Sequence, residues 1–331
     1  MKACIIGGGS WGSAFALHLG RLKVRTKLWV REEDIHETLL KTRENKTFLP
    51  GHVFPAPVSF YRDLPEAVVS TEFLFVAVPS QFCRSLYAEI APYLTSDQIV
   101  VSLTKGLEQK SLKRMSQVME EVFHPFRNPR LAVLSGPSFA KEVALGNPTA
   151  VVVASRDPEC ARKVQHLVSS LALRAYSTSD VIGVEIGGAL KNVIAIAGGI
   201  SDALECGLNS KAALMTRGLV EMTRLGTHLG ARRETFSGLA GMGDLILTCT
   251  GELSRNHYVG FELGKGRSLR TILSRMKMVA EGVRTTLSAH NLARREGVEM
   301  PISDEVYHVL YRNRSPRKAI EDLMSRALKP E

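Results

Sequence analysis

Six short apolar runs, separated by longer mixed segments, dominate the first half of the sequence. They occupy residues 2–8, 26–30, 72–80, 98–106, 130–138 and 149–155. Nearly continuous apolar runs of this length, rich in β-branched residues, are typical of strands that are covered on both faces. The segments between them are long enough to supply crossover helices. The pattern therefore predicts an α/β fold in which residues 1–180 form a doubly wound, largely parallel sheet.

Long helical patterns replace these runs after about residue 180, at residues 183–200, 210–230 and 285–297. A chain of 331 residues is long enough for two domains, because single hydrophobic cores stop growing near ~250–300 residues. We therefore predict a second, mostly α-helical C-terminal domain over residues 181–331.

The composition argues against several classes of protein. The formal net charge is +10, but no basic stripe is interleaved with aromatic residues, so nucleic acid is not an expected partner. The five cysteines are scattered and never spaced as CxxC, so neither a disulfide framework nor a metal site is expected. No apolar run approaches the ~18 residues of a membrane span, and the N-terminus lacks a signal peptide, so we expect a cytoplasmic protein.

The first junction between a strand and a helix reads IIGGGSWGSAF. It places Gly7, Gly9 and Gly12 in the spacing G-x-G-x-x-G directly after an apolar strand. In a Rossmann-like βαβ unit these glycines allow a tight turn, close approach of the backbone to a pyrophosphate, and close packing of the helix on the strand. The motif predicts a dinucleotide site, although a purely structural glycine turn would give the same triplet.

The end of the second strand bears on the choice of dinucleotide. A carboxylate there would accept a hydrogen bond from the ribose 2′-hydroxyl of NAD, but the sequence KLWVREE puts Arg31 first. An arginine can pair with the 2′-phosphate of NADP, so NADP is favoured or at least tolerated. The alternative, Arg31 as a solvated loop charge, stays open.

Polar residues follow three further strands, in Pro79-Ser80-Gln81, Thr104-Lys105-Gly106 and Ser135-Gly136-Pro137-Ser138. In an open α/β sheet, ligands bind beyond the carboxyl ends of the strands, so we expect these loops to converge. Lys105 would then contact a ligand, whereas a single lysine at a strand end is more often a surface charge.

Two features stand out in the helical half. Ser254 precedes Arg255 and Asn256 at the start of an expected helix, and a helix N-terminus beside an arginine and an amide can bind an anion such as phosphate. Asp244 follows two glycines nearby. Read alone, Ser254 is a helix cap and Arg255 a surface charge.

The stretch GVEIGGALKNVIAIAGGI at residues 183–200 places Lys191 in what otherwise reads as a buried helix. An unpaired ammonium is costly to bury, so the lysine must be paired, reach the surface, or have a chemical role. On a helix, four small residues share its face: Gly187, Gly188, Ala195 and Gly198. This shelf invites close approach by another helix or by a substrate with a nicotinamide ring.

Taken together, these stretches resemble the bacterial type of NAD(P)-dependent glycerol-3-phosphate dehydrogenase. The resemblance extends over almost the whole chain, through GGGSWGSAFA, NKTFLPG, SLTKGLE, SGPSFAKEVALGNPTAVVVAS, GVEIGGALKNVIAIAGGI, GLAGMGDLILTCTGELSRN and VAEGVRTT. It implies reversible reduction of dihydroxyacetone phosphate, a phosphorylated three-carbon substrate, to sn-glycerol 3-phosphate with NADPH or NADH. It also implies a supply of backbone for glycerophospholipid synthesis, and a chain that can form a homodimer.

The resemblance further implies roles for individual residues. The catalytic residues would be Lys191, which acts as acid and base, Lys105 and Asp244. The cofactor would be held by Gly7, Gly9, Ser10, Trp11, Gly12, Arg31, Lys105, Ala140, Arg255, Val279 and Glu281. The substrate would be held by Lys105, Gly136, Ser138, Lys191, Asp244, Ser254, Arg255 and Asn256. Phe15 and Met242 stand where relatives usually carry leucine, and Phe48 where they often carry tyrosine. Only the change at Phe48 would remove a polar contact near the cofactor, so it bears on nucleotide preference more than on the reaction.

Two alternatives stay open at the level of the sequence. A related β-hydroxyacid dehydrogenase, of the 6-phosphogluconate or hydroxyisobutyrate type, also pairs a Rossmann domain with a helical one and uses a lysine. A non-catalytic sensor of NAD(P)H would bind the cofactor without turnover. A sensor, however, would have no use for Lys105, Lys191, Asp244 and the run Ser254-Arg255-Asn256 together.

Overall fold

A computed structural model describes residues 1–126, 128–276 and 278–328 of the chain. The chain divides into two compact units, Met1–Lys105 with Lys113–Glu185, and Gly106–Leu112 with Ile186–Glu331. The second boundary lies inside a helix, a few residues beyond the expected division between 1–180 and 181–331. That division stays a prediction, because compactness alone does not show that the two parts fold independently.

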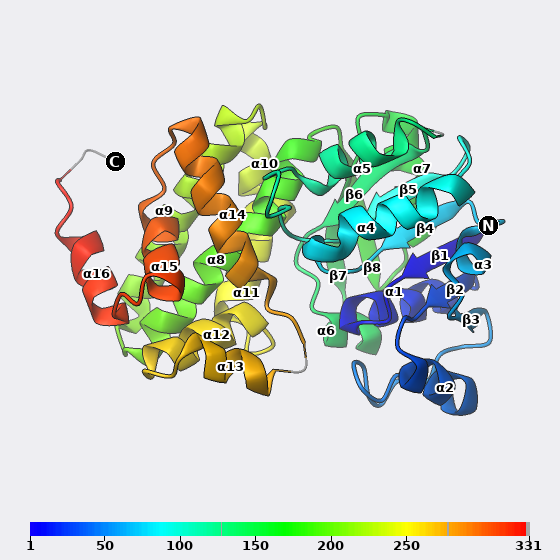
Figure 1. The fold of residues 1–331 in the computed structure, drawn as a ribbon, viewed down its shortest axis with the longest axis horizontal. Helices are drawn as coiled ribbons and strands as arrows, with labels where there is room; N and C mark the ends of the chain where they lie inside the picture. Colours follow the sequence, from blue (N-terminus) through cyan, green and yellow to red (C-terminus); the bar gives the residue numbers. More distant parts are fainter. Residues whose placement is uncertain (127, 277, 329–331) are drawn as a thin grey trace. The chain divides into compact units, whose positions relative to one another are not determined.

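The first unit is built on an eight-stranded sheet (Figure 1). Its strands are β1 (Lys2–Ile6), β2 (Arg25–Trp29), β3 (Val58–Tyr61), β4 (Phe73–Val76), β5 (Ile99–Ser102), β6 (Arg130–Ser135), β7 (Thr149–Ala154) and β8 (Leu173–Thr178). In space they run in the order β3-β2-β1-β4-β5-β6-β7-β8, and neighbouring strands are parallel except β6 and β7. The prediction of a doubly wound, largely parallel sheet is confirmed.

The six apolar runs correspond to β1, β2, β4, β5, β6 and β7, whereas the sequence prediction omits β3 and β8. These two are the edge strands of the sheet. Buried and exposed residues alternate along both, so polar letters interrupt each run. An edge strand has a neighbour on one side only and is covered less than an inner strand. It therefore lacks the continuous apolar signature on which the prediction depends.

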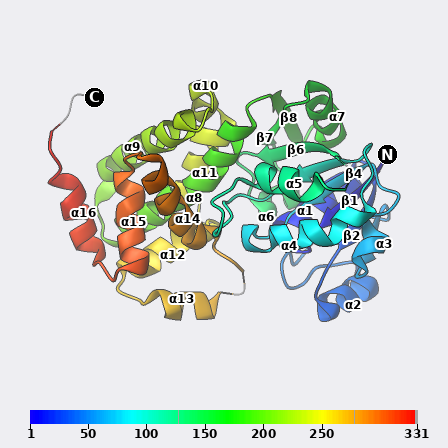
Figure 2. The same ribbon diagram turned by 45° about the horizontal axis from the view of Figure 1, so that its top comes forward.

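Helices cover both faces of the sheet. They are α1 (Ser10–Arg21), α2 (Glu33–Thr42), α3 (Leu64–Val68), α4 (Ser80–Ile90), the short 3-10 turn η1 (Ala91–Tyr93), α5 (Met115–Phe123), α6 (Ala140–Leu145) and α7 (Pro158–Val168). Ala3 and Ile5 of β1 belong to the core cluster that contains Phe15 of α1. Because side chains alternate along a strand, Cys4 and Ile6 point to the opposite face. Figures 1 and 2 show α4 and α5 side by side on one face of the sheet.

The second unit is helical. Its elements are α8 (Val181–Ala203, whose first turn belongs to the first unit), α9 (Gly207–His228), α10 (Arg233–Ser237), the π-helical turn η2 (Leu239–Gly243), α11 (Asp244–Thr250), α12 (Arg255–Gly264), α13 (Leu269–Arg275), α14 (Glu281–Glu296), α15 (Pro301–Tyr311) and α16 (Pro316–Met324). The three predicted helical segments correspond to α8, α9 and α14. The prediction of a mostly α-helical C-terminal part is therefore confirmed.

Helix α8 corrects one expectation. It is 23 residues long, and its most apolar window has a mean hydropathy of 1.5, so by length and composition it could cross a membrane. Glu185 and Lys191 interrupt this stretch in the sequence, so no continuous apolar run is expected there. In the structure, 83% of that window is buried. Such burial is typical of a helix in the core of a protein, so α8 is weak support for a membrane span.

Glu221 of α9 holds the start of α15. Its Oε1 accepts a hydrogen bond from Ile302 N at 2.6 Å, and its Oε2 accepts from Ser303 N at 3.1 Å and Ser303 Oγ at 3.0 Å. The first N–H groups of a helix have no partner within the helix, so a buried carboxylate satisfies them here. Burial nevertheless raises the pKa of Glu221 to about 7, because the three donors offset only part of the desolvation and the Asp304 carboxylate adds to the rise.

The raised pKa predicts how stability depends on pH. A carboxyl whose pKa is higher in the folded than in the unfolded chain binds more protons when folded, so stability should fall as pH rises from about 4.5 to about 7. Glu221→Gln removes this titration. Across that window, the free energy of unfolding of the wild type should therefore decrease by about 3 kcal/mol relative to that of the variant. Denaturant unfolding at a series of pH values measures the difference.

The matched control is Glu234→Gln, which changes an exposed carboxyl in the same unit and should leave the pH profile of the wild type unchanged. If Glu221→Gln showed the wild-type profile as well, the ionisation of Glu221 would not be coupled to folding.

Candidate active site

The chain leaves β1 through a turn in which the predicted glycines have different environments. Gly7 has φ +119°, and a Cβ there would lie 2.7 Å from Ala77 O. A Cβ on Gly12 would lie 1.9 Å from Gly7 O, so the start of α1 packs directly on the end of β1. A Cβ on Gly9 would meet no described atom within 4 Å. Gly9 alone of the three therefore leaves open space beside the backbone.

Ser10 and Trp11 begin helix α1. Ser10 Oγ donates to Phe48 O at 2.8 Å, which ties the turn to the loop between α2 and β3. The Trp11 ring packs on Phe15 with centroids 5.5 Å apart, and its Nε1 is buried without an acceptor among the described residues. Phe48, the departure from the family pattern, thus contacts Ser10 through its main chain, and this contact does not require a tyrosine hydroxyl.

Arg31 lies just beyond the end of β2, with 69% of its side chain exposed. It pairs with Glu32 Oε1 at 3.3 Å, and its guanidinium carbon lies 5.9 Å from the centroid of the Phe82 ring. An exposed ion pair contributes about 1 kcal/mol or less, so it would not hold Arg31 away from another anion. The exposed position of Arg31 therefore fits both alternatives, a contact with the 2′-phosphate of NADP and a solvated loop charge.

The loops after three neighbouring strands converge. Thr104 Oγ1 donates to Val78 O at 2.8 Å, which joins the loops after β5 and β4. Lys105 Nζ donates to Gly136 O at 2.8 Å, which joins the loops after β5 and β6. Ser138 Oγ donates to the same carbonyl at 2.9 Å. The prediction that these strand ends meet is confirmed, and Lys105 lies beside the residues that the family pattern assigns to the substrate.

Lys191 is paired within the second unit. Its Nζ donates to Asp244 Oδ1 and, at 2.8 Å, to Thr248 Oγ1. Thr248 Oγ1 donates in turn to Asp244 O. Lys191 is 6% exposed and Asp244 is fully buried. The buried ammonium is tolerated because hydrogen bonds to a carboxylate and a hydroxyl replace those that it would make to water.

Two of the small residues beside Lys191 lie against other segments of the same unit. A Cβ on Gly187 would lie 2.4 Å from Ala240 O of η2, and a Cβ on Gly198 would lie 3.7 Å from the Cβ of Cys249 in α11. Of the two alternatives for the shelf, packing against another helix is therefore the one that holds at these positions. A Cβ on Gly198 would make only an ordinary contact, whereas Gly187 allows the close approach of η2, which leads directly into α11 and its residues Asp244 and Thr248.

Ser254 and Asn256 have distinct hydrogen-bond partners at the start of α12. Ser254 Oγ accepts from His257 N at 3.2 Å and caps the helix. The buried Asn256 side chain donates to Asn192 Oδ1 at 2.8 Å and accepts from Gly282 N at 2.9 Å. Asn256 thereby connects α12 to α8 and α14, next to Lys191 in the sequence of α8.

Arg255 keeps an exposed side chain between these two residues. Neighbouring atoms desolvate its guanidinium enough to lower the pKa of Arg255, and the Glu281 carboxylate opposes this shift. The group stays cationic, because an arginine loses its proton only at extreme pH. Val279, 38% exposed, lies two residues before Glu281, at the start of α14.

The structure thus gathers the predicted residues into one group in each unit, and their roles stay predictions. The first group lies at the carboxyl ends of the strands and at the start of α6: Gly7, Gly9, Ser10, Trp11, Gly12, Arg31, Lys105, Gly136, Ser138 and Ala140. The second lies on α8, α11, α12 and the start of α14: Lys191, Asp244, Ser254, Arg255, Asn256, Val279 and Glu281.

Sequence reasoning missed Thr248 and Asn192, which contact the second group, and Asn45, which bonds to Gly8 between Gly7 and Gly9 of the first group. The spacing of Thr248, one helical turn after Asp244, could have indicated it. Within the described ranges, no cluster of three or more His, Cys, Asp or Glu side chains could hold a metal ion, and the five cysteines are free thiols.

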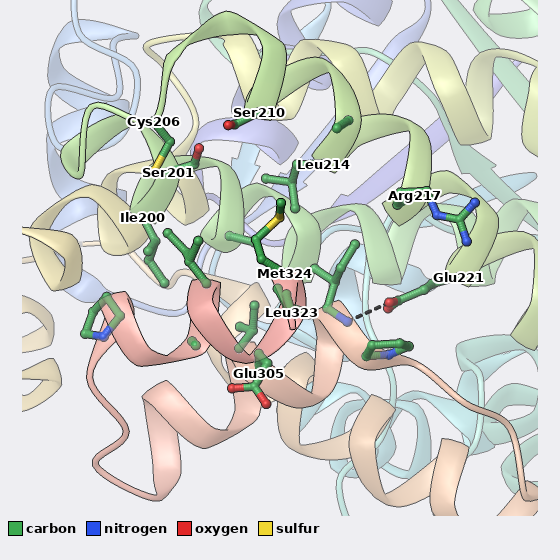
Figure 3. A pocket seen from close by; sticks show the side chains of 18 of the residues that line it. Ile200, Ser201, Cys206, Ser210, Leu214, Arg217, Glu221, Glu305, Leu323 and Met324 are labelled. Carbon is green, nitrogen blue, oxygen red and sulfur yellow. Dashed lines mark hydrogen bonds between the residues drawn. The ribbon is translucent and has the colours of Figure 1, made fainter. Parts of the chain in front are cut away.

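A separate cavity of about 510 Å³ lies within the second unit (Figure 3). Apolar side chains such as Ile200, Leu214 and Met324 line it, and Glu221 forms part of its wall. None of the predicted site residues lines this cavity. Polar side chains such as Arg217 and Glu305 also line it, but the family resemblance assigns none of them to the cofactor or the substrate. We therefore place the candidate active site at the two groups of predicted residues, one in each unit, and not at this cavity.

Comparison with protein families matches the chain over most of its length. Residues 2–161 match the family model described as NAD-dependent glycerol-3-phosphate dehydrogenase N-terminus, and residues 180–321 match the corresponding C-terminus. A glycerol-3-phosphate dehydrogenase [NAD(P)+] from Geobacter sulfurreducens is 51% identical over 327 residues, which are 99% of this chain and 98% of that protein. One from Syntrophotalea carbinolica is 50% identical over 331 residues, 100% of this chain and 99% of that protein.

Solved structures agree with these matches. A crystal structure of glycerol-3-phosphate dehydrogenase from Coxiella burnetii has a TM-score of 0.95 and 36% identity, and the match covers 98% of this chain and 99% of that one. A ketopantoate reductase from Ralstonia eutropha has a TM-score of 0.61 at 13% identity and shares the fold alone. On the family models and on the full-length identity to these relatives, the chain belongs to the NAD-dependent glycerol-3-phosphate dehydrogenase family.

Proposed function

We propose that this protein catalyses the reversible, NAD(P)H-dependent reduction of dihydroxyacetone phosphate to sn-glycerol 3-phosphate. The observation that carries the proposal is the buried Lys191, held by Asp244 and Thr248 in a chain about half identical to glycerol-3-phosphate dehydrogenases of the same length. The product supplies the backbone for glycerophospholipid synthesis.

The glycine turn fits a dinucleotide. The open space at Gly9, next to the first N–H groups of α1, is where a pyrophosphate would approach the backbone, since helix N-termini favour anions. Trp11 and Ser10 would line the same turn, and Ala140 would lie across from it at the start of α6. When bound, the nicotinamide supplies the hydride that reduces the substrate carbonyl carbon.

Lys191 supplies the proton. Hydride addition at C2 of dihydroxyacetone phosphate leaves negative charge on the C2 oxygen, and the Lys191 ammonium donates a proton to that oxygen. In the reverse direction the neutral amine accepts the proton from the C2 hydroxyl. Asp244 and Thr248 hold Nζ in one orientation. The family resemblance assigns Lys105 to the substrate as a second cation.

Arg255 and the capped N-terminus of α12 hold the substrate phosphate. An exposed arginine beside a helix N-terminus offers both a charge and backbone N–H groups to an anion. The family resemblance also assigns Gly136 and Ser138, in the loop after β6, to the substrate, and Val279 and Glu281, beside the start of α14, to the cofactor.

The five free thiols support the further proposal that the protein works in a reducing compartment, the cytoplasm. We also propose that the protein forms a homodimer, which the family resemblance implies. The partner is a small phosphorylated molecule, with no role for nucleic acid or for a membrane span.

The experiment that tests the function is a spectrophotometric assay with dihydroxyacetone phosphate, run with NADH and NADPH side by side. We expect turnover with both cofactors, with NADPH favoured because the exposed Arg31 can pair with its 2′-phosphate. Oxidation of 6-phosphogluconate or hydroxyisobutyrate with NADP⁺ instead would assign the chain a different substrate. Quenching of NADPH fluorescence without turnover would indicate a sensor.

Replacement of Lys191 should abolish turnover. In Lys191→Met we expect kcat to fall by several orders of magnitude, because the proposed proton donor is removed, while NADPH still binds to the first unit. The buried Asp244 carboxylate is then left without its cation, so stability should fall by about 3–5 kcal/mol. Kinetic assays, fluorescence titration and thermal unfolding measure the three effects.

The double variant Lys191→Met with Asp244→Asn separates catalysis from folding. It removes both charges, so it should regain much of the lost stability and still turn over no substrate. Recovery of turnover together with stability would show that Lys191 has a structural role only.

Arg255→Ala should chiefly raise KM for dihydroxyacetone phosphate, by about tenfold or more, since a charge-assisted bond to phosphate is lost. The KM for NADPH should change less. Arg270→Ala removes the same charge from an exposed position in the same unit and serves as the control. Equal effects of the two variants would mean that only overall charge matters, and the phosphate site would then lie elsewhere.

A further inference from the structure

We propose that Asn45 is a positioning residue for the cofactor: its side chain fixes the Gly8 carbonyl and thereby aims the Gly9 N–H at the pyrophosphate of the dinucleotide. The inference rests on the proposed function, because it requires that the dinucleotide bind at the glycine turn. Asn45 lies in the loop between α2 and β3, 37 residues beyond Gly8 in the sequence.

The Asn45 side chain is completely buried, and each of its polar atoms has a partner. Nδ2 donates to Gly8 O at 2.7 Å and to Ser13 Oγ at 2.9 Å, and Oδ1 accepts from Phe48 N at 3.0 Å. The orientation of the amide is fixed by these partners, because Gly8 O can only accept and Phe48 N can only donate. Asn45 therefore cannot be replaced by a carboxylate of the same shape without loss of two donors.

The contact to Gly8 determines the direction of the next N–H. In a trans peptide the C=O of one residue and the N–H of the next point in opposite directions. When Asn45 and Ser13 draw the Gly8 carbonyl inward, the Gly9 N–H points away from them. No described residue accepts a hydrogen bond from Gly9 N, and the space beside Gly9 is open. The N–H is thus set toward the place where a phosphate oxygen would lie.

The loop that carries Asn45 is itself held rigidly. Arg43 donates to the carbonyls of Phe54, Pro55 and Val58 at 2.9, 2.7 and 2.7 Å. Ser10 Oγ donates to Phe48 O, so the loop is tied to the start of α1 at a second point. The Gly8 backbone packs closely against Val30, since a Cβ added to Gly8 would lie only 2.7 Å from the Val30 side chain. This contact prevents the turn from moving toward the end of β2. Asn45 therefore acts from a fixed position on a turn that has little freedom.

The test compares Asn45→Asp, Asn45→Ala and Ser13→Ala with wild type in the full-length protein. NADPH affinity is measured by fluorescence titration, and kcat and both KM values by the reduction of dihydroxyacetone phosphate. We expect Asn45→Asp and Asn45→Ala to raise the Kd and KM for NADPH about tenfold or more, and Ser13→Ala about threefold. The kcat at saturating NADPH and the KM for dihydroxyacetone phosphate should stay within about twofold of wild type, which a general loss of structure would not allow.

The control is Asn147→Ala, an exposed asparagine in the same unit, which should bind NADPH as wild type does. If Asn45→Ala does not fold, the isosteric Asn45→Asp and the small change Ser13→Ala carry the test. An NADPH Kd within twofold of wild type in folded Asn45→Asp would overturn the proposal, as would a parallel fall in kcat. A wild type that binds NADPH without turnover would contradict the proposed function alone, since the effect of Asn45 on the Kd could still be measured.

Discussion

The buried ion pair between Lys191 and Asp244 is the interaction on which the helical unit depends. Asp244 has no exposed surface and Lys191 has almost none, so either group alone would carry a large desolvation cost. The pair can form only if the start of α11 lies close to α8, and the absence of a side chain at Gly187 permits the close approach of η2, which leads directly into α11. The packing of the unit and the orientation of the Lys191 amine, the proposed proton donor, therefore have the same cause.

The sheet unit depends on a comparable constraint at the end of β1. The carbonyl oxygen of Gly7 lies where a Cβ of Gly12 would be, so the strand and the helix that follows it meet with no side chain between them. Gly7 and Gly8 are buried in this packing, and Gly9 leaves open space beside the backbone of the turn. The sheet order places this turn between β1 and β4, where the direction of winding reverses and where ligands bind in folds of this kind.

Features that depend on local sequence could be predicted, and those that depend on contacts distant in sequence could not. The inner strands, the glycine turn and the buried position of Lys191 follow from patterns within a few residues. The edge strands β3 and β8 lack the apolar run, because one neighbour covers less of a strand than two. Thr248 lies 57 residues from Lys191 and Asn45 lies 32 residues from Ser13, so only the folded chain shows that they touch.

The three adjacent residues Ser254, Arg255 and Asn256 have different contacts in the structure. The Ser254 hydroxyl accepts from His257 N, and the Asn256 amide is bonded to Asn192 and Gly282 on two other helices. A substrate that bonded to Asn256 would share an amide that already holds α8, α12 and α14 together. Arg255 has an exposed cation at the same helix start, so in the proposed reaction Arg255 attracts the substrate phosphate. Asn256 holds α12, the helix that begins with Arg255, beside the part of α8 that contains Lys191.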